Sequence, residues 1–350
     1  MNTFLKYLFK IRTNLSNAFI QYLGRYIGLS GLYYTFLSSA FARERRAVLA
    51  GKLKHLEETK RLKSNYFLLV RNTHRLEKGL LMRPRRAIFA VDYIEETIDC
   101  FVNIYKTDTI HENNQLKWFR DVLELYFKSV EITPFLSTQQ DRFIKHIQAS
   151  IEALSVIEKS VPYCRILQDQ STISFEEFYK LAKQRRSVRW FLDRSVSREL
   201  IDKAVLVANQ SPSACNRQPF EYRIFDDPKL VKELVNYPMG TKGYGHSIPV
   251  MIVVVGNLDA YFDERDRHVI YIDASLANMS LMLALETLGL SSCSINWPDI
   301  EARERKMEKF LKLEKYQRPI MCIGVGYPDP EGMVAFSEKR PLSQIRKYNI

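Results

Sequence analysis

The chain has little of what marks several protein classes. Its five cysteines are odd in number and scattered, without CxxC or Cys/His ligand spacing: Cys100, Cys164, Cys215, Cys293 and Cys322. This pattern argues against a disulfide framework and a zinc site, so we expect no metal and a reducing, cytoplasmic location. No GxGxxG or GxxxxGK loop occurs, which makes a Rossmann or P-loop site unlikely. The N-terminus also lacks the features of a secretory signal.

What is present indicates a globular protein of about two domains. The 350 residues are 46% hydrophobic and 26% charged, which is neither the composition of a disordered chain nor that of a polytopic membrane protein. The net charge of +12 is uneven. Residues 1–94 hold 18 Lys and Arg against 5 Asp and Glu. In residues 95–350, the remaining 34 Lys and Arg and 35 Asp and Glu nearly cancel. The basic character therefore belongs to the N-terminal region.

Residues 1–64 are expected to form a basic amphipathic helical segment. Apolar residues from Phe4 to Leu23 recur at helical spacing, with Lys6, Lys10 and Arg12 between them. The uncharged run from Tyr26 to Ala42 is short for a membrane-spanning helix. We interpret the segment as lying on a surface. That surface is either an anionic membrane, at the inner membrane face, or the rest of the protein or a second subunit.

Residues 65–167 are expected to form a helical domain. Within it, the stretch RNTHRLEKGLLMRPRR, residues 71–86, is polar and does not resemble a helix interior. His74, Glu77 and Lys78 have the spacing of one helical face, where a carboxylate can orient an imidazole, and they are candidate substrate contacts. The alternative is a salt-bridged helix end capped at Gly79.

Residues 168–350 are expected to form a second, mixed domain. After a polar linker, Ser174 and Glu177 have capping-box spacing and start a helix. Strands are expected at 220–225, 249–256, 291–296 and 318–324, with a long apolar helix at 271–288. Because helices and strands alternate without a regular βαβ repeat, a doubly wound fold is not favoured.

Two stretches of this domain carry chemistry. KQRRSVRWFLDRSV, residues 183–196, gathers Lys183, Arg185, Arg186 and Arg189 around Ser187. Guanidinium groups and a hydroxyl suit a phosphate, although a solvated basic turn has the same composition. SPSACNRQPF, residues 211–220, holds amide side chains between prolines, which suits the edge of a heterocycle.

These stretches resemble the flavin-dependent nitroreductase family over about residues 175–342. The resemblance rests on four motifs in the family's order: RRSVRWF at 185–191, SPSACNRQPF at 211–220, DASLANMSLMLALETLGLSSCSINW at 273–297, and IGVGYPDPE at 323–331 followed by EKRPL. It implies an α+β fold with a central mixed sheet flanked by helices, and a homodimer that binds FMN at the subunit interface.

The resemblance also assigns cofactor contacts. It places Arg185, Arg186 and Ser187 at the flavin phosphate and ribityl chain, and Arg189 at the pyrimidine end. Asn216 would meet the pyrimidine edge, and Pro212, Ser213 and Gln218 would shape the adjoining wall, Ser213 toward the partner subunit's flavin. Ser294, Ile295 and Asn296 would face the ring, with the backbone N–H of Asn296 at N5. Lys339 or Arg340 would clamp the phosphate.

Other residues are candidates for substrate contacts. Trp297 is expected to stack or gate above the ring, or to be a core tryptophan. Tyr244 and His246, in a glycine loop, could donate a proton, although loop aromatics more often pack. No catalytic acid/base pair is assigned, because flavin hydride transfer needs none from the protein.

The expected function is an FMN-dependent oxidoreductase that takes electrons from NAD(P)H and reduces an organic substrate. The helical half resembles extensions of nitroreductase-like proteins linked to bacterial surface-polysaccharide synthesis, which implies a sugar-linked substrate. The alternative is a non-enzymatic membrane adaptor with a vestigial flavin fold. Nucleic-acid binding is not expected, because the N-terminal aromatic residues lie on the apolar stripe.

Overall fold

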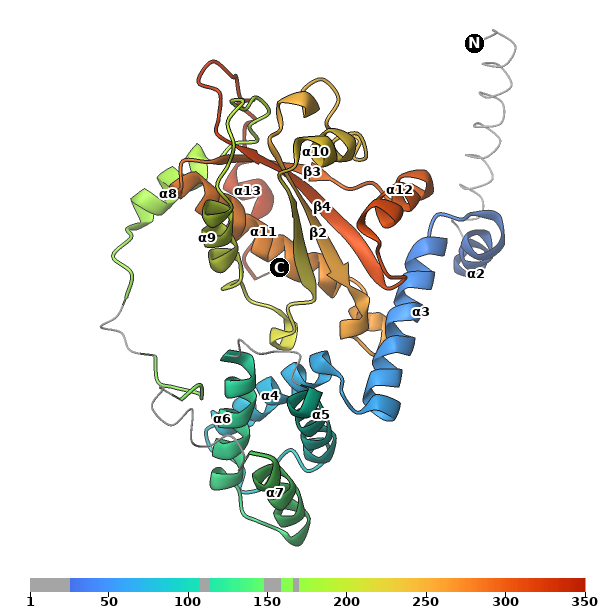
Figure 1. The fold of residues 1–350 in the computed structure, drawn as a ribbon, viewed down its shortest axis with the longest axis vertical. Coiled ribbons are helices and arrows are strands. Elements are labelled where there is room, and N and C mark those ends of the chain that lie inside the picture. The colour runs from blue at the N-terminus through green and yellow to red at the C-terminus, as the bar shows by residue number, and fades with distance from the viewer. Residues whose placement is uncertain (1–25, 108–113, 148–158, 166–169, 350) are drawn as a thin grey trace.

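The computed structural model describes residues 26–107, 114–147, 159–165 and 170–349. It contains a helical unit and an α+β unit, and one long N-terminal helix runs alongside both (Figure 1). The predicted apolar stripe from Phe4 to Leu23 lies outside the described residues.

The N-terminal segment is helical where it is described. Its elements are α2 (Ile27–Leu32), the π-helix η1 (Tyr33–Leu37), α3 (Ala42–Glu57) and the π-helix η2 (Glu58–Leu62). One face of α3 packs on the α+β unit and buries Ala47, Gly51 and His55. The predicted segment 1–64 therefore contains a helix that shares the core of the α+β unit.

Ion pairs hold the same helix. The Arg43 guanidinium donates to Glu301 at 2.8 Å and to Glu308 at 2.5 Å. Hydrogen bonds from Arg43 and from Arg305 lower the pKa of Glu301 to about 2. Lys54 donates to Asp259 at 2.6 Å, and the Asp259 carboxyl is almost fully buried. Because these partners come from distant parts of the sequence, the pairs fix how α3 lies on the domain.

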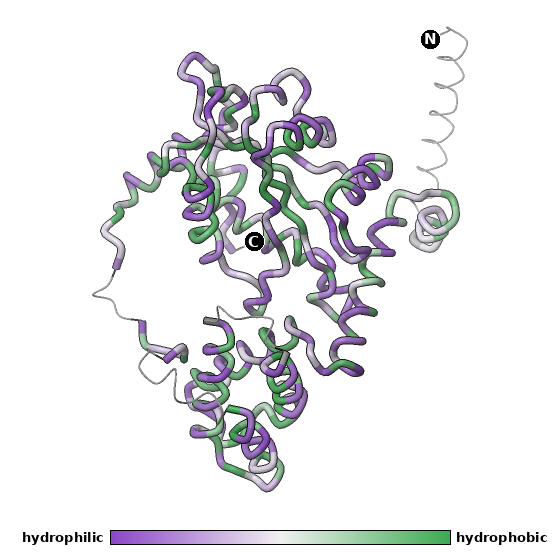
Figure 2. The backbone as a smooth tube through the Cα atoms, in the orientation of Figure 1, coloured by the Kyte–Doolittle hydropathy of each residue, from purple (hydrophilic) through white to green (hydrophobic). Residues whose placement is uncertain are grey.

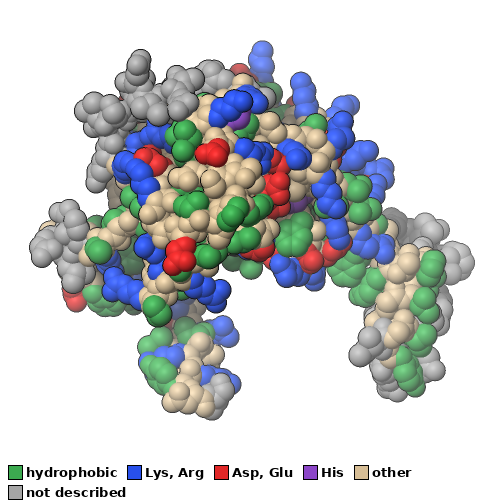
Figure 3. Space-filling view, turned by 90° about the horizontal axis from the view of Figure 1, so that it is seen from below, with side chains coloured by type: hydrophobic (Ala, Val, Ile, Leu, Met, Phe, Trp, Pro, Cys, Tyr) green, Lys and Arg blue, Asp and Glu red, His purple; other side chains and the backbone are tan. Residues whose placement is uncertain are grey.

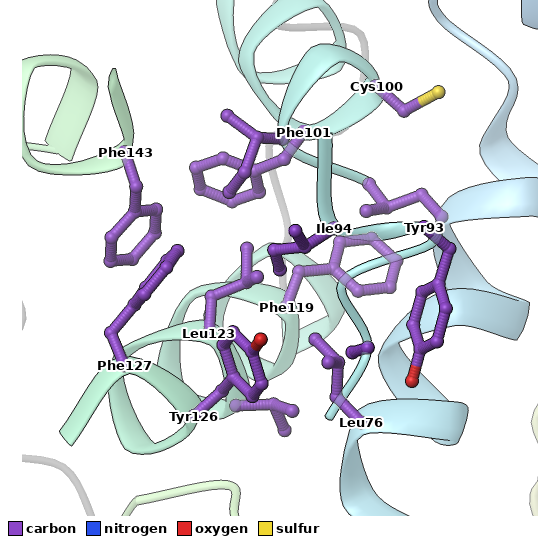
Figure 4. Close-up of a cluster of buried hydrophobic side chains, with 14 of the residues drawn as sticks. Leu76, Tyr93, Ile94, Cys100, Phe101, Phe119, Leu123, Tyr126, Phe127 and Phe143 are labelled. Atoms are coloured by element: carbon purple, nitrogen blue, oxygen red, sulfur yellow. The ribbon is translucent and has the colours of Figure 1, made fainter. Parts of the chain in front are cut away.

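The helical unit consists of α4 (Tyr66–Leu80), α5 (Ile94–Thr107), α6 (Asn114–Ser129) and α7 (Pro134–Ile147). Its own core is rich in aromatic residues, including Phe101, Phe119, Tyr126 and Phe143 (Figure 4). The prediction for residues 71–86 was partly wrong, since α4 continues through Arg71 to Leu80. The buried residues Leu69, Leu76 and Leu80 lie on its inner face, so one apolar stripe outweighs the polar composition.

The α+β unit is built on an antiparallel sheet of order β1-β2-β4-β3. The strands are β1 (Phe220–Phe225), β2 (Val250–Asn257), β3 (Ser291–Asn296) and β4 (Gln317–Gly326). A parallel component comes from an isolated bridge between Ser187 and Ser292. β2 is buried along nearly its whole length, as expected for a strand covered on both faces. Hydrophobic residues predominate along the central strands (Figure 2).

Helices cover both faces of this sheet. Val250, Ile252 and Val254 face α9 (Arg198–Ala208) and α11 (Val269–Thr287), whereas the alternate residues of β2 face α10 (Pro228–Leu234) and α12 (Glu301–Leu311). The remaining elements are α8 (Phe175–Gln184), α13 (Leu342–Ile345) and the short 3₁₀ turns η5 (Ala214–Asn216), η6 (Gly245–Ser247), η7 (Leu258–Ala260) and η8 (Glu264–Asp266). The predicted α+β fold class is confirmed.

Among the described residues, one helical stretch, Glu264–Thr287, is long and apolar enough to cross a membrane by length and composition. It contains α11, which packs on α9 and on the sheet, and half of its most apolar stretch is buried. A core helix of a soluble domain passes the same test.

The contact of α3 with η7 predicts a sharp effect at Gly51. A Cβ atom there would lie 2.6 Å from the Leu258 carbonyl carbon and oxygen, whereas one at Gly28 would meet nothing within 4 Å. We expect Gly51→Ala to destabilise the protein by about 1–3 kcal/mol, because backbone has to move. Gly28→Ala is the matched control, and we expect it to be neutral or stabilising. Equal denaturation midpoints for the two variants would contradict this packing.

Candidate functional site

The cationic segment begins where α8 ends. Ser174 caps this helix by accepting from the Glu177 N–H at 3.2 Å, as the sequence predicts. The helix stops at Arg185, and the chain then runs alongside β3, where the Val188 N–H donates to the Ser292 carbonyl at 3.0 Å. Residues 185–189 are therefore held by the sheet and are not a free basic turn.

Two polar atoms, one in the cationic segment and one on the neighbouring strand β3, are buried without a hydrogen-bond partner among the described residues. They are Nε of Arg185 and Oγ of Ser292, and Ser292 pairs with Ser187 in the parallel bridge. A buried N–H or hydroxyl group without a partner costs about 1–3 kcal/mol. Each group therefore still needs a hydrogen-bond acceptor, which an oxyanion could provide.

The C-terminal segment returns to the same place. Nη1 of Arg186 donates to the Phe336 carbonyl at 3.2 Å, a contact between residues 150 positions apart. Lys339 and Arg340 follow three and four residues later, and both are exposed. The structure thus places the proposed phosphate clamp in the segment that contacts Arg186.

Arg189 lies beside the glycine loop. Its guanidinium carbon is 5.8 Å from the ring centroid of Tyr244, and its carbonyl accepts from Ser247 at 2.8 Å. Tyr244 is buried, and its hydroxyl is 3.6 Å from Sγ of Cys293. Burial raises the pKa of Tyr244, which keeps the phenol neutral. Tyr244 thus packs under β3 and supports Arg189, while His246 is exposed beside Trp190.

The far end of β3 holds the residues assigned to the flavin ring. Ser294 is half-buried, Ile295 is buried and Asn296 is exposed. Trp297 is buried, and its indole N–H donates to Glu304 at 2.8 Å. Burial raises the pKa of Glu304, and its ion pair with Arg318 at 3.1 Å opposes that shift. Trp297 thus occupies a core position that fixes the chain just after Asn296.

The loop of residues 211–218 has an unusual backbone. Cys215, Asn216 and Gln218 all have left-handed φ angles near +50°. Such a conformation costs roughly 1 kcal/mol or more for each non-glycine residue. The Gln218 N–H donates to the Ser213 hydroxyl at 2.7 Å, and Gln218 Nε2 lies 3.4 Å from Asn216 Oδ1. Pro212 is exposed at the start of the loop. The loop is therefore held in one specific shape.

Asp273 holds that shape, and sequence reasoning did not assign it to the site. Its carboxylate accepts from the Ser213 hydroxyl at 2.6 Å and from the Ala214 N–H at 3.0 Å. Asp273 is buried in the first turns of α11. The signal was available, because a carboxylate near the start of a long apolar helix needs a polar partner.

The two groups of candidate residues lie at opposite ends of α11 (Figure 1). Asp273 binds the loop of residues 211–218, whereas Glu286 contacts Gln184 at 3.4 Å, next to Arg185. At 1.5 Å per residue the distance along the helix is about 20 Å. One chain therefore does not bring Asn216 and Arg185 together.

The candidate substrate residues of α4 lie in the helical unit. His74 Nδ1 is 3.3 Å from Glu77, and Glu77 accepts from the Trp118 indole at 2.9 Å. Lys78 is exposed. The His74–Glu77 pair thus packs toward α6, whereas α4 also packs on η5 through another face.

A groove of about 1150 Å³ lies next to the cationic segment. Its lining includes Phe191, Lys242, His246 and Arg303, but none of residues 185–189. No group of three or more His, Cys, Asp and Glu side chains arranged to hold a metal occurs within the described ranges.

Comparison with known proteins agrees with the motifs. Residues 182–242 and 231–327 match the nitroreductase family model. Human iodotyrosine deiodinase 1 is 27% identical over 198 residues, 49% of this chain and 68% of that protein. A putative NADH dehydrogenase/NAD(P)H nitroreductase from Archaeoglobus fulgidus is 28% identical over 160 residues, which are 45% of this chain and 88% of that protein.

Among solved structures, an FMN-dependent nitroreductase from Clostridium difficile R20291 is 24% identical, with a TM-score of 0.42, covering 49% of this chain and 98% of that one. Residues 182–327 thus match the nitroreductase family, and the α+β unit that contains them has the nitroreductase fold.

Proposed function

We propose that the protein is an FMN-dependent oxidoreductase that takes electrons from NAD(P)H and reduces an organic substrate. The observation that carries this proposal is the buried Arg185 Nε without a partner, together with the equally unpartnered hydroxyl of Ser292, the residue that pairs with Ser187. Arg186, Ser187 and the returning C-terminal segment complete a cradle of the kind that a phosphate monoester needs.

Bound FMN would supply two-electron chemistry, because its ring system accepts and donates hydride. The protein's part is to hold charge and hydrogen bonds in place. We expect Arg189 to stabilise negative charge at the pyrimidine end of the ring, since a fixed cation there costs no reorganisation. Buried Trp297, fixed by Glu304, holds the backbone of Asn296 in a defined position. The donor NAD(P)H is suggested by the name of the archaeal relative.

The proposal includes a homodimer. Because about 20 Å of α11 separate the two halves of the candidate site, the loop of residues 211–218 would serve the flavin of a second copy. An apolar stripe of Ile272, Leu276 and Met279 is exposed along the same helix, with side chains 41–56% accessible. These residues have helical spacing on one face, and a second copy would remove them from water.

The names of the relatives support two classes of substrate. Their names include iodotyrosine deiodination and nitroreduction, both reductions of small organic molecules. The predicted sugar-linked substrate remains a hypothesis.

We further propose peripheral attachment to an anionic membrane, at the inner face. The segment of α2 and η1 exposes apolar side chains, among them Leu32 at 54%, Phe36 at 76% and Leu37 at 66%. Hydrophobic side chains lie along the projecting part of the surface where α2 is found (Figure 3). Arg45 and Arg46 follow on α3 and are exposed. Apolar residues beside cations are typical of interfacial helices.

Flavin binding and reduction form the central test. We expect purified protein with FMN to be yellow and to bleach when NADH or NADPH is added without oxygen. In an Arg185→Gln/Arg186→Gln variant, affinity for FMN should fall at least tenfold, because charge-assisted hydrogen bonds to phosphate are lost. Affinity for riboflavin, which has no phosphate, should change little. Flavin absorbance and fluorescence titrations measure both.

Arg45→Gln, a charge change on the exposed face of α3, is the matched control for that experiment. A colourless protein that does not take up FMN would contradict the enzyme proposal and support the membrane adaptor. Equal losses for FMN and riboflavin would place the two arginines away from the phosphate.

The dimer makes a separate prediction. Leu276→Arg places a charge in the stripe on α11, so we expect monomers by light scattering and loss of FMN binding although Arg185 is intact. Leu230→Arg on α10 is the matched control, since Leu230 is 42% exposed on a helix over the opposite face of the sheet. If the Leu276→Arg protein is monomeric and still binds FMN as well as the wild type does, the shared site is disproved.

Membrane attachment predicts that Leu32→Ser/Phe36→Ser releases the protein from phosphatidylserine-containing vesicles in a sedimentation assay. Binding of the unmodified protein should weaken as salt rises, because lipid charge is screened. Leu81→Ser/Met82→Ser is the control, since both residues are about half exposed but lie in the helical unit. Unchanged binding of the first variant would exclude this segment as the attachment site.

A further inference from the structure

Three arginines meet where the helical unit contacts the α+β unit. α4, which carries Arg71 and Arg75, packs directly on the η5 turn that precedes Arg217. The Arg71 guanidinium lies 5.3 Å from the ring centroid of Phe262, and that of Arg217 lies 4.8 Å from the ring centroid of Tyr261. The two rings are adjacent in sequence, so both guanidinium groups lie against the same short segment.

Arg217 is buried without a counter-ion. Arg217 is only 6% exposed, and its Nε is buried without a hydrogen-bond partner. Neither Arg217 nor Arg71 takes part in any of the ion pairs or side-chain hydrogen bonds found among the described residues. Aromatic faces attract both cations, at about 0.5–2 kcal/mol each, which offsets only part of the cost of desolvating a charge.

The carboxylates near this junction are already engaged. Asp273 accepts from Ser213 and Ala214, and Glu96 accepts from the Asn72 amide at 2.9 Å. Asp92 lies 3.5 Å from Arg75, whose charge it partly balances. No acid is left within hydrogen-bond distance of Arg71 or Arg217 in the part of the chain that is described.

The cations also repel one another. Burial, and then Arg75 and Arg217, lower the pKa of Arg71, and the nearby Glu96 carboxylate opposes this shift only in part. The pKa of His55 is lowered mainly by burial and also by Arg217 and Arg71. Its ring therefore stays neutral and adds no positive charge at pH 7. Like charges stay together in a folded protein when an anion joins them.

We propose that Arg71 and Arg217, with Arg75 beside them, form a binding site for an oxyanion, the phosphate or carboxylate group of a small organic molecule. Planar guanidinium groups bind both kinds of oxyanion through paired N–H donors. The site joins the strained loop of residues 211–218 to the helical unit, so each unit supplies part of it.

The inference extends the proposed function in one respect. If the loop of residues 211–218 borders a flavin, the oxyanion belongs to the substrate, and the helical unit selects anionic substrates. The binding site itself does not depend on flavin, because none of its arginines lies in the cradle at Arg185 and Arg186.

Titration with inorganic phosphate and, separately, with malonate tests the site in full-length protein by calorimetry and thermal melting. Anions could also bind at the proposed flavin cradle. To prevent this, both titrations use the Arg185→Gln/Arg186→Gln protein and, in parallel, protein saturated with FMN. We expect saturable binding of at least one anion, and the tighter of the two identifies the oxyanion. Arg71→Gln and Arg217→Gln should each weaken it about tenfold or more, whereas Arg45→Gln should not.

Stability separates a binding role from a structural one. Without anion, we expect Arg217→Gln to melt at the same temperature as the parent or higher, since an unpaired buried charge is removed. Arg217→Lys keeps the charge but not the paired donors, so it should bind the anion more weakly than the parent does. The proposal is overturned if phosphate and malonate bind Arg71→Gln and Arg217→Gln as they bind the parent, or if neither binds in the Arg185→Gln/Arg186→Gln background. If the unmodified protein does not bind FMN but the anion still binds, the proposed function alone is contradicted.

Discussion

The length of α11 is the constraint on which the rest of the site depends. The helix is buried on one side against α9 and the sheet, and it holds Asp273 near one end and Glu286 near the other. Each of these carboxylates contacts a different candidate segment. With a rigid spacer of about 20 Å between them, the cradle and the loop of the proposed enzyme would act on one flavin only across two copies. The exposed stripe on the same helix is consistent with that arrangement.

Arginines divide into two classes in this protein, and the division points to ligands. Arg43 is matched by Glu301 and Glu308, and its role is to hold α3 on the α+β unit. Arg185 and Arg217 each keep a buried Nε without a partner; Arg318 does so too, but it is ion-paired with Asp299 and Glu304. Since a buried N–H group without a hydrogen-bond partner costs free energy, we expect Arg185 and Arg217 to lie where an anion completes the structure.

The strands and the cationic segment could be predicted from the sequence because their signals are local. The bounds of β1 and β3 agree with the expected ranges, and the capping pair Ser174 and Glu177 starts α8 as expected. The polar stretch after Arg71 was not recognised as a helix interior, although the spacing of His74, Glu77 and Lys78 indicated a helical face, because composition hid the buried stripe of α4. Asp273 was missed because its partners, Ser213 and Ala214, are distant in the sequence.

The sequence by itself determined the fold class and the presence of a cationic segment next to a serine, since alternating apolar residues and charge spacing are properties of neighbouring positions. Only the tertiary structure decided where α3 lies, which ends of α11 carry the two candidate segments, and that Arg71 approaches Arg217. These are contacts between residues far apart in the chain. They depend on which apolar faces pack together and on which charges remain unpaired after packing, and no local pattern encodes either.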